Sequence, residues 1–223
     1  MNSMINCPLH SDQHASMKIY GPVAYCFVCC MSIPTAELNL PSSITPQTKQ
    51  IEDVGAMMEY IKTLPTAHIR GLELPYDESG YFVVWPNGRF FKKRKNYGST
   101  RYLAPAGHKV PLYICPGDSR NLLVVEGELN AQSLYNVIWE HDYKIVSPGS
   151  AGEFLKHIDF YLKYDKITLI LDRDAAGVVH GTHIKDILLK HRRNASLVLV
   201  KTDFNDKLQE SEEALKAYFW EVM

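Results

Sequence analysis

Two short apolar runs in the C-terminal half of the chain each end in acidic residues. The run at 122–125 leads directly into Glu-Gly-Glu at 126–128, and the run at 167–171 leads into Asp-Arg-Asp at 172–174. Short runs that are rich in leucine and β-branched residues and bounded by glycine are typical of buried parallel strands. The carboxyl ends of such strands meet at one edge of the sheet, where ligands bind. The acids are therefore expected to face a common crevice.

Unpaired carboxylates in one crevice repel one another, and a divalent cation relieves that repulsion. Carboxylate oxygens are hard ligands that suit Mg²⁺ or Mn²⁺, and ions held in this way commonly organise phosphoryl transfer. Glu126, Asp172 and Asp174 are the first candidates for metal ligands and for catalytic residues. Asp203 and Asp206 follow a further strand-like run and are candidates for additional ligands.

Strand-like and helix-like segments alternate from residue 122 onward. Apolar residues between the expected strands keep the spacing of one helical face. This order predicts a small doubly wound α/β unit with a parallel sheet and right-handed crossovers. The expected strands are 122–125, 143–147, 167–171 and 196–200. A turn of small residues at 147–152 fits a close approach to a phosphate and equally an ordinary turn. Acids such as Glu128 and Asp206 have the alternative role of capping helices.

The size and composition of the chain allow one domain of ordinary size plus a small one, since it has 223 residues. A content of 46% hydrophobic and 22% charged residues is typical of a globular protein in water. No apolar stretch approaches the length of a membrane span, and the N-terminus lacks a basic region before an apolar core. The odd count of five cysteines argues against a secreted disulfide framework. These features favour the cytosol and no membrane partner.

A cysteine and histidine module occupies the first part of the chain. Two ligand pairs, each with two residues between its members, are separated by fifteen residues. Pairs on separate turns place four ligands at tetrahedral corners, which favours a structural Zn²⁺ that holds together a piece too small for a core of its own. The expected ligands are Cys7, His10, Cys26 and Cys29. His14 and Cys30 are the alternative ligands, and a redox pair at 26 and 29 is the alternative interpretation.

The rest of the N-terminal half divides at composition changes. We expect a zinc-binding ribbon at 1–33, a linker rich in Pro, Ser, Thr and Gln at 34–50, a mixed basic subdomain at 51–118 and the doubly wound unit at 119–223. Within the basic subdomain, the spacing of apolar residues predicts a helix over 51–61. A strand is expected at 81–85, followed by a hairpin turn at 86–89. Cys115 is expected to be a buried strand residue without a chemical role.

The subdomain at 51–118 carries an uneven charge. No Asp or Glu occurs between 79 and 117, whereas seven basic residues do: Arg89, Lys92, Lys93, Arg94, Lys95, Arg101 and Lys109. A basic region beside an acidic metal crevice suits a polyanion that is held against magnesium-dependent chemistry. The alternative is a solvated loop with a run of lysines.

Taken together, these motifs resemble those of TOPRIM-domain DNA primases of bacterial and phage type. The sequences at 125–128 and 171–177 resemble the paired acid motifs of the TOPRIM domain. Cys-Pro-Leu-His at 7–10 and Tyr-Cys-Phe-Val-Cys at 25–29 resemble the CHC2-like zinc ribbon of these enzymes. Arg101-Tyr102-Leu103 is similar to the Lys-Tyr-Leu element of their RNA-polymerising region, and 203–206 resembles a third acidic motif of phage-type members. The resemblance covers nearly the whole chain, in the order of the family.

The resemblance implies synthesis of short RNA primers from ribonucleoside triphosphates on a single-stranded DNA template, by metal-dependent nucleotidyl transfer, in the replication of a phage or plasmid. The ribbon would help to select the template sequence. Glu126, Asp172 and Asp174 would bind the catalytic Mg²⁺ or Mn²⁺, with Asp203 and Asp206 as further candidates. The residues expected to contact nucleotide or template are Lys92, Lys93, Arg94, Arg101 and Lys109.

The resemblance also bears on partners and on two departures from the family pattern. No Walker-type Gly-Lys-Ser/Thr loop is present, so a replicative helicase is expected as a separate chain, in the host cytoplasm if the protein is phage-encoded. Asn130 stands where many members have a further acid, which predicts a weaker ligand set or a ligand from elsewhere. Arg101 replaces the lysine of the family element, which keeps the charge but changes the geometry of a phosphate contact.

Two other functions use the same features. A TOPRIM nuclease, or another hydrolytic enzyme, would employ the same metal crevice to cleave DNA without ribonucleotides. A non-catalytic module would use zinc and the basic residues to bind single-stranded DNA, and Asn130 is its support in the sequence.

Overall fold

The computed structural model describes residues 4–6, 8, 17–20, 23–26, 32–34, 38, 53–96 and 102–223. The chain divides into two compact units, Met1–Ile51 and Glu52–Met223. The first unit contains an antiparallel sheet in the order β1 (Met4–Ile5), β2 (Met17–Tyr20), β3 (Val23–Cys26) and β4 (Ser32–Pro34). Met17, Ala24 and Cys26 are fully buried in it. Cys7, His10 and Cys29 lie outside the described residues, so the zinc site stays a prediction.

The second unit begins with one helix and an antiparallel sheet. Helix α1 (Val54–Thr63) starts after Asp53, whose side chain accepts a hydrogen bond from the backbone N–H of Ala56 at 3.1 Å. The sheet has the order β5 (Thr66–Ile69), β6 (Leu72–Asp77), β7 (Gly80–Val84), β8 (Phe91–Lys95) and β9 (Tyr102–Leu103). Met58 and Ile61 of α1 pack against Phe82 and Phe91 of the sheet. The predicted helix, strand and hairpin turn of this subdomain are confirmed.

A second sheet follows in the order β10-β12-β11-β13-β14. Strands β11 (Asn121–Val125), β12 (Lys144–Ser147), β13 (Lys166–Asp172) and β14 (Asn194–Val200) are parallel, and β10 (Tyr113–Ile114) is antiparallel to β12. The four predicted strands are therefore confirmed. Strand β10 pairs with β12 of this sheet, although it lies within residues 51–118, which the sequence assigned to the preceding subdomain.

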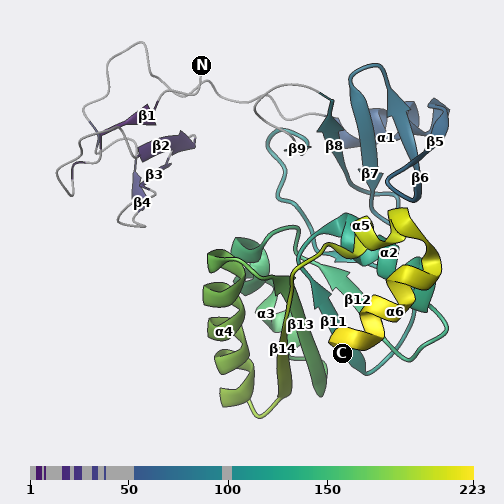
Figure 1. Cartoon of the computed structure of the whole chain (residues 1–223). Helices are drawn as coiled ribbons and strands as arrows, with labels where there is room; N and C mark the ends of the chain where they lie inside the picture. Colours follow the sequence, from purple (N-terminus) through teal and green to yellow (C-terminus); the bar gives the residue numbers. More distant parts are fainter. Residues whose placement is uncertain are drawn as a thin grey trace. The chain divides into compact units, whose positions relative to one another are not determined.

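Helices cover both faces of the second sheet, as predicted for a doubly wound unit (Figure 1). Alternate residues of a strand point to opposite faces. Leu123 and Val125 of β11 accordingly join the core with α2 (Glu128–Ile138), α5 (Phe204–Glu210) and α6 (Glu212–Val222). Leu122 and Val124 join the core with the 3₁₀ helix η3 (Ala151–His157), α3 (Ile158–Tyr161) and α4 (Ala175–Lys190).

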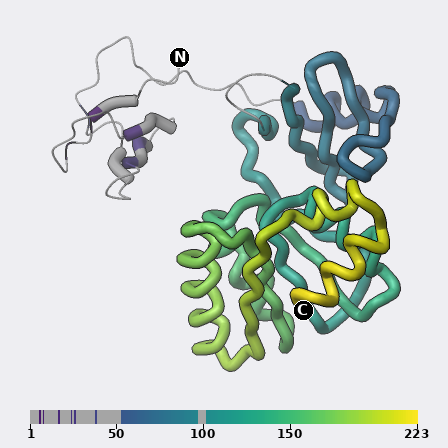
Figure 2. The backbone as a smooth tube through the Cα atoms, in the orientation of Figure 1, coloured from purple at the N-terminus to yellow at the C-terminus, as the bar shows by residue number. Residues whose placement is uncertain are grey.

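The two sheets of the second unit share one hydrophobic core. Trp85 of the first sheet packs edge-on against Tyr113 of the second, and its indole N–H donates to the carbonyl of Pro111 at 3.2 Å. Cys115 is buried in the same core, and burial raises the pKa of its thiol to about 12, which agrees with a packing role. The backbone trace in Figure 2 shows the segment after β14, in yellow, lying beside α2. Among the described residues no helix is both long enough and apolar enough to cross a bilayer.

Candidate metal and phosphate site

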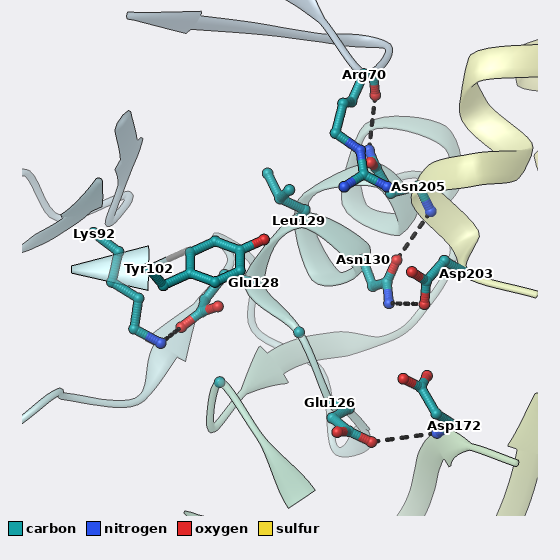
Figure 3. Close-up of a pocket in the computed structure, with 12 residues that line it drawn as sticks. Arg70, Lys92, Tyr102, Glu126, Glu128, Leu129, Asn130, Asp172, Asp203 and Asn205 are labelled. Carbon is teal, nitrogen blue, oxygen red and sulfur yellow. Dashed lines mark hydrogen bonds and ion pairs between the residues drawn. The ribbon is translucent and has the colours of Figure 1, made fainter. Parts of the chain in front are cut away.

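Three of the acids predicted from the strand ends, Glu126, Asp172 and Asp203, line a common pocket of about 230 Å³ in the second unit (Figure 3). Glu126 follows β11, Asp172 is the last residue of β13, and Asp203 precedes α5. The parallel register brings the first two together, since Val125 lies opposite Ile170 and the N–H of Glu126 donates to the carbonyl of Ile170 at 3.2 Å.

Glu126 is held in place by backbone groups of two neighbouring segments. Its Oε1 accepts from the N–H of Ala151, and its Oε2 accepts from the N–H of Asp172, each at 3.3 Å. Burial raises the pKa of Glu126, and the charges of Asp174 and Asp203 act in the same direction, whereas the two backbone hydrogen bonds oppose the shift. The carboxylate is thus oriented by its neighbours and costly to ionise without a cation.

Asp172 has the most perturbed carboxyl group of the pocket. Its pKa is raised to about 6, mainly by burial and then by the charges of Glu126, Asp203 and Asp174. Each of these effects disfavours the ionised form. A divalent cation at this position would favour the ionised form of Asp172, because its charge stabilises the carboxylates that otherwise repel one another.

Asp174 and Asp206 line an adjoining pocket of about 430 Å³ together with Asp172 and Asp203. Asp174 caps helix α4, since one of its oxygens accepts from the N–H of Gly177 at 2.7 Å. Asp206 instead pairs with the guanidinium of Arg70 at 2.7 Å. Glu128 and Asp206 lie in the first turns of α2 and α5, where an acid favours the helix dipole, but the side chain that caps a helix by a hydrogen bond here is Asp174.

The turn after β13 depends on a glycine. A Cβ at Gly177 would lie 2.0 Å from the carbonyl oxygen of Asp172, so no larger residue fits without moving the backbone that carries the acid. The Asp-Arg-Asp-Ala-Ala-Gly sequence is thereby explained: its acids supply the pocket and the cap, and its glycine lets helix α4 start close to the strand end.

The donors fit a magnesium or manganese ion in kind, since they are carboxylate oxygens that converge on two adjoining pockets. Within the ranges 53–96 and 102–223 and the few described positions before them, no three His, Cys, Asp or Glu side chains already form a group that could hold an ion. Glu126, Asp172, Asp203 and Glu128 are the acids of the first pocket, and Glu128 is already paired with Lys92. The other three are the ones that would hold a metal there, with Asp174 and Asp206 at its edge.

The basic run on β8 is divided between two faces of the strand, as alternation requires. Lys92 lines the acid pocket and forms an ion pair with Glu128. Lys93 forms an ion pair with Asp77, and its ammonium lies 4.6 Å from the ring centroid of Phe82. Both lysines that the sequence assigned to nucleotide or template contact are ion-paired, and what distinguishes them is that Lys92 lines the acid pocket whereas Lys93 does not.

The other basic candidates lie in different surroundings. Arg94 donates to the hydroxyl of Tyr81 at 3.0 Å, and its guanidinium carbon lies 5.3 Å from the ring centroid of Tyr102. Lys109 lines a cleft of about 910 Å³ that also includes Lys92, Lys156 and the turn at Gly149. Arg101 lies outside the described residues.

The turn of small residues at 147–152 borders the cleft that contains Lys109, which we call the basic cleft. Gly149 of this turn lines both the basic cleft and the acid pocket. Gly149 has a φ of +89°, and a Cβ there would lie 2.5 Å from Glu128 Oε1 and 2.7 Å from Lys92 Nζ. The turn therefore packs directly against the Lys92–Glu128 pair. The sequence left two roles open for this turn, a close approach to a phosphate and an ordinary turn. The structure shows that the turn packs on two side chains and borders a cleft lined by three lysines.

Sequence reasoning missed Arg70, which lines the acid pocket. It belongs to the turn between β5 and β6, where its φ of +54° and the +77° of Gly71 reverse the chain. Its backbone carbonyl accepts from the side-chain amide of Asn205 at 2.8 Å, and its guanidinium pairs with Asp206. The Arg-Gly turn was visible in the sequence, but its contact with a segment 135 residues away was not.

Asn130 also has a role that the sequence did not indicate. Its side-chain amide donates to Asp203 Oδ1 at 3.0 Å, and its side-chain carbonyl accepts from the backbone N–H of Asn205 at 3.0 Å (Figure 3). The position that was expected to weaken the ligand set therefore joins helix α2 to the acidic segment before α5.

Comparison with known proteins finds similar solved structures but no matching family and no matching curated sequence. No model of a known protein family matches the chain. No curated protein matches it either. The structure is similar to the primase fragment of the bacteriophage T7 primase-helicase protein, with a TM-score of 0.53 and 15% sequence identity over 98% of this chain and 99% of that chain. At that identity the likeness establishes the fold alone: the mixed α/β fold of a phage-type primase fragment.

Two further solved structures are more distant, and no conclusion rests on them. A DnaG catalytic core has a TM-score of 0.46 and 18% identity, over 77% of this chain and 61% of that chain. The zinc-binding and RNA polymerase domains of the Aquifex aeolicus primase have a TM-score of 0.45 and 14% identity, over 98% of this chain and 78% of that chain.

Proposed function

We propose that this chain is a DNA primase, a nucleotidyltransferase that makes short RNA primers on single-stranded DNA. The observation that carries the proposal is the pocket in which Glu126, Asp172 and Asp203 meet Lys92 and Arg70. Carboxylates at the ends of parallel strands supply metal ligands, and the two cations beside them supply contacts for phosphate oxygens. The likeness of the fold to the T7 primase fragment supports the same activity.

In the proposed reaction the 3′-hydroxyl of one nucleotide attacks the α-phosphorus of the next, and pyrophosphate leaves. An ion bound by the acids would stabilise charge on the attacking and leaving oxygens. Arg70 and Lys92, from the first sheet, would bind and orient the phosphates against the second sheet. Glu126 is the proposed acceptor of the hydroxyl proton, since two backbone N–H groups fix the orientation of its carboxylate in the pocket.

The N-terminal unit is proposed to hold a structural zinc through Cys7, His10, Cys26 and Cys29 and to help select the template. The spacing of the four residues supports this assignment. The proposed partners are single-stranded DNA, ribonucleoside triphosphates and a replicative helicase. The helicase is supported by the name of the T7 protein, which is a primase-helicase.

Primer synthesis is tested by incubating the protein with ribonucleoside triphosphates, Mg²⁺ or Mn²⁺ and single-stranded templates of mixed sequence. The expected product is short RNA that depends on the metal and on the template. Cleavage of the DNA without any need for ribonucleotides would identify a nuclease instead. Binding of the template with neither product would identify a non-catalytic binding module.

A further inference from the structure

Asn130 lies at the junction between helix α2 and the acidic segment that starts α5. It is the third residue of α2, and only 8% of its surface is exposed. Its amide donates to Asp203 Oδ1, and its carbonyl accepts from the N–H of Asn205, each at 3.0 Å. Both ends of the side chain are thus used within the protein, one of them on an acid of the pocket.

Asp203 depends on this contact for its orientation. It occupies the N-cap position of α5, but within this described helix its carboxylate makes no capping hydrogen bond. Asp174, in the corresponding position of α4, does accept a hydrogen bond from its own helix. The carboxylate of Asp203 is instead held from outside by the amide of Asn130, which bonds one of its two oxygens at the edge of the acid pocket.

The chemistry of the junction requires a carboxamide. An asparagine side chain both donates and accepts, whereas an ionised aspartate only accepts. Aspartate at position 130 would still accept from Asn205, but it would set a second carboxylate about 3 Å from Asp203, where like charges repel.

The junction continues into the interior. Asn205 is 1% exposed, and its side-chain amide donates to Ser133 Oγ at 3.0 Å as well as to the carbonyl of Arg70. The segment that carries Asp203 is therefore tied to α2 and to the Arg70 turn by buried hydrogen bonds. Small movements of Asn130 are transmitted to Asp203 because the surrounding atoms are packed and cannot absorb them.

We infer that Asn130 is a positioning residue that holds Asp203 for metal binding, rather than a position where a metal ligand is missing. This inference rests on the proposed function, since it assumes that the acid pocket binds a metal. Hydrogen-bonding partners of metal ligands typically contribute about 10–100-fold to metal affinity. Loss of the Asn130 amide should therefore weaken metal binding although Asn130 itself does not contact the ion.

The test measures Mn²⁺ affinity by the paramagnetic resonance signal of the free ion, together with thermal unfolding of the metal-free protein. Asn130→Ala should bind Mn²⁺ at least about tenfold more weakly than the unsubstituted protein. The exchange variant Asn130→Asp/Asp203→Asn keeps the hydrogen bond with its direction reversed, so its unfolding temperature should exceed that of Asn130→Asp alone. Its Mn²⁺ affinity should stay low, since the carboxylate is now at position 130.

A matched control comes from the other end of the sheet. Asn121 donates to Asp142 Oδ2 at 3.1 Å, so Asn121→Asp also sets two carboxylates together, but far from the pocket. It should leave the Mn²⁺ affinity unchanged. Unchanged affinity in Asn130→Ala, or affinity restored along with stability in the exchange variant, would overturn the inference.

If Asn130→Ala does not fold, Asn130→Gln takes its place, since it keeps Asp203 and a carboxamide but moves the donor by one methylene, and it should likewise weaken Mn²⁺ binding. Asp172→Asn separates this inference from the proposed function. If Asp172→Asn loses Mn²⁺ binding and the exchange variant retains it, only the role of Asn130 is wrong. If Asp172→Asn binds Mn²⁺ normally, the acid pocket is not the metal site, and both proposals fail.

Discussion

Lys92 and Glu128 form an ion pair that joins the basic sheet to the acid-bearing sheet, with 14% of the lysine side chain and 9% of the glutamate side chain exposed. The lysine comes from β8 and the glutamate from the first turn of α2. The ammonium also lies 5.9 Å from the ring centroid of Trp85. One of the cations proposed to bind phosphate is therefore held in place by an acid of the Glu-Gly-Glu motif.

Removal of one member of this pair should be far more harmful to stability than removal of both. Lys92→Met leaves Glu128 without its partner in a buried position, which should lower the free energy of unfolding by about 3 kcal/mol. The double variant Lys92→Met/Glu128→Met should recover most of that loss, because neither charge of the pair remains buried. Urea unfolding at pH 7 measures both. Primer synthesis should stay low in both variants, and a stable double variant with normal synthesis would remove Lys92 from the proposed phosphate site.

Gly177→Ala should destabilise the protein and displace Asp172. The new Cβ would meet the carbonyl oxygen of Asp172 at 2.0 Å, and overpacking of this kind costs about 1–3 kcal/mol. Gly152→Ala is the matched control, since it lies in η3 and no described atom comes within 4 Å of its Cβ position. The control should unfold at the temperature of the unsubstituted protein or above it. Equal unfolding temperatures for the two variants would show that the turn before α4 adjusts freely.

The acids of the pocket were predictable because a carboxylate comes directly at the end of two strand-like runs in the sequence, with a glycine shortly after it. Glu126 and Asp172 each end a run whose apolar pattern identifies a parallel strand, and the topology of such a sheet brings the strand ends together. Arg70 and Asn205 were not predictable, because they meet through a fold that brings together positions 135 residues apart.

For the basic run on β8, the sequence predicts the charge but not the contacts of each side chain. Four consecutive cations on β8 predict a polyanion contact, but a strand alternates its side chains between two faces. The partners on each face, Glu128 for Lys92 and Asp77 for Lys93, come from other elements and decide which charge is available. The sequence therefore predicts that the segment is basic. It does not predict which of the basic side chains form ion pairs within the protein and which face a ligand.

Salt dependence should separate binding lysines from structural ones. Lys109 and Lys156 line the basic cleft, and 66% of the Lys156 side chain stays exposed beside its partner Glu153, so the double variant Lys109→Ala/Lys156→Ala should bind single-stranded DNA more weakly. Its plot of log affinity against log salt should be shallower by about 0.7 for each phosphate that the variant no longer neutralises. Lys93→Ala should keep the slope of the unsubstituted protein, because Lys93 is paired with Asp77. A shallower slope for Lys93→Ala would place that side chain on the nucleic acid.

Zinc content should report on the N-terminal unit alone. Cys26 is buried in β3 and is one of the four proposed ligands. Cys26→Ser should lose the metal and template-directed initiation. The α/β unit should unfold as before, since the chain divides into two compact units at residue 51. Elemental analysis and circular dichroism measure the two effects. A full equivalent of zinc in this variant would exclude Cys26 as an essential ligand.

The acid pocket is tested most directly by Asp172→Asn and Asp174→Asn. Each substitution keeps the size of the side chain and removes one negative charge, so primer synthesis should fall by about 10²–10³-fold, as on loss of a principal charge stabiliser. Binding of single-stranded DNA should persist, because neither aspartate lines the basic cleft. Zinc content should be unchanged. Near-normal synthesis by Asp172→Asn would mean that this crevice is not the catalytic centre, whereas near-normal synthesis by Asp174→Asn alone would restrict Asp174 to its capping role.

The free energy of unfolding of the metal-free protein should depend on pH, because Asp172 is buried among like charges. The pKa of Asp172 is about 6 in the folded protein against an ordinary value of 3.8, so the folded state binds more protons between these values. Stability should therefore fall as the pH rises through this window, and the penalty should be complete above about pH 6. Asp172→Asn removes the titrating group and should be more stable than the unsubstituted protein at pH 7.5 but not at pH 4. Urea unfolding at the two pH values, in the presence of a chelator, measures the difference. An advantage of the same size at both pH values would assign it to packing rather than to charge.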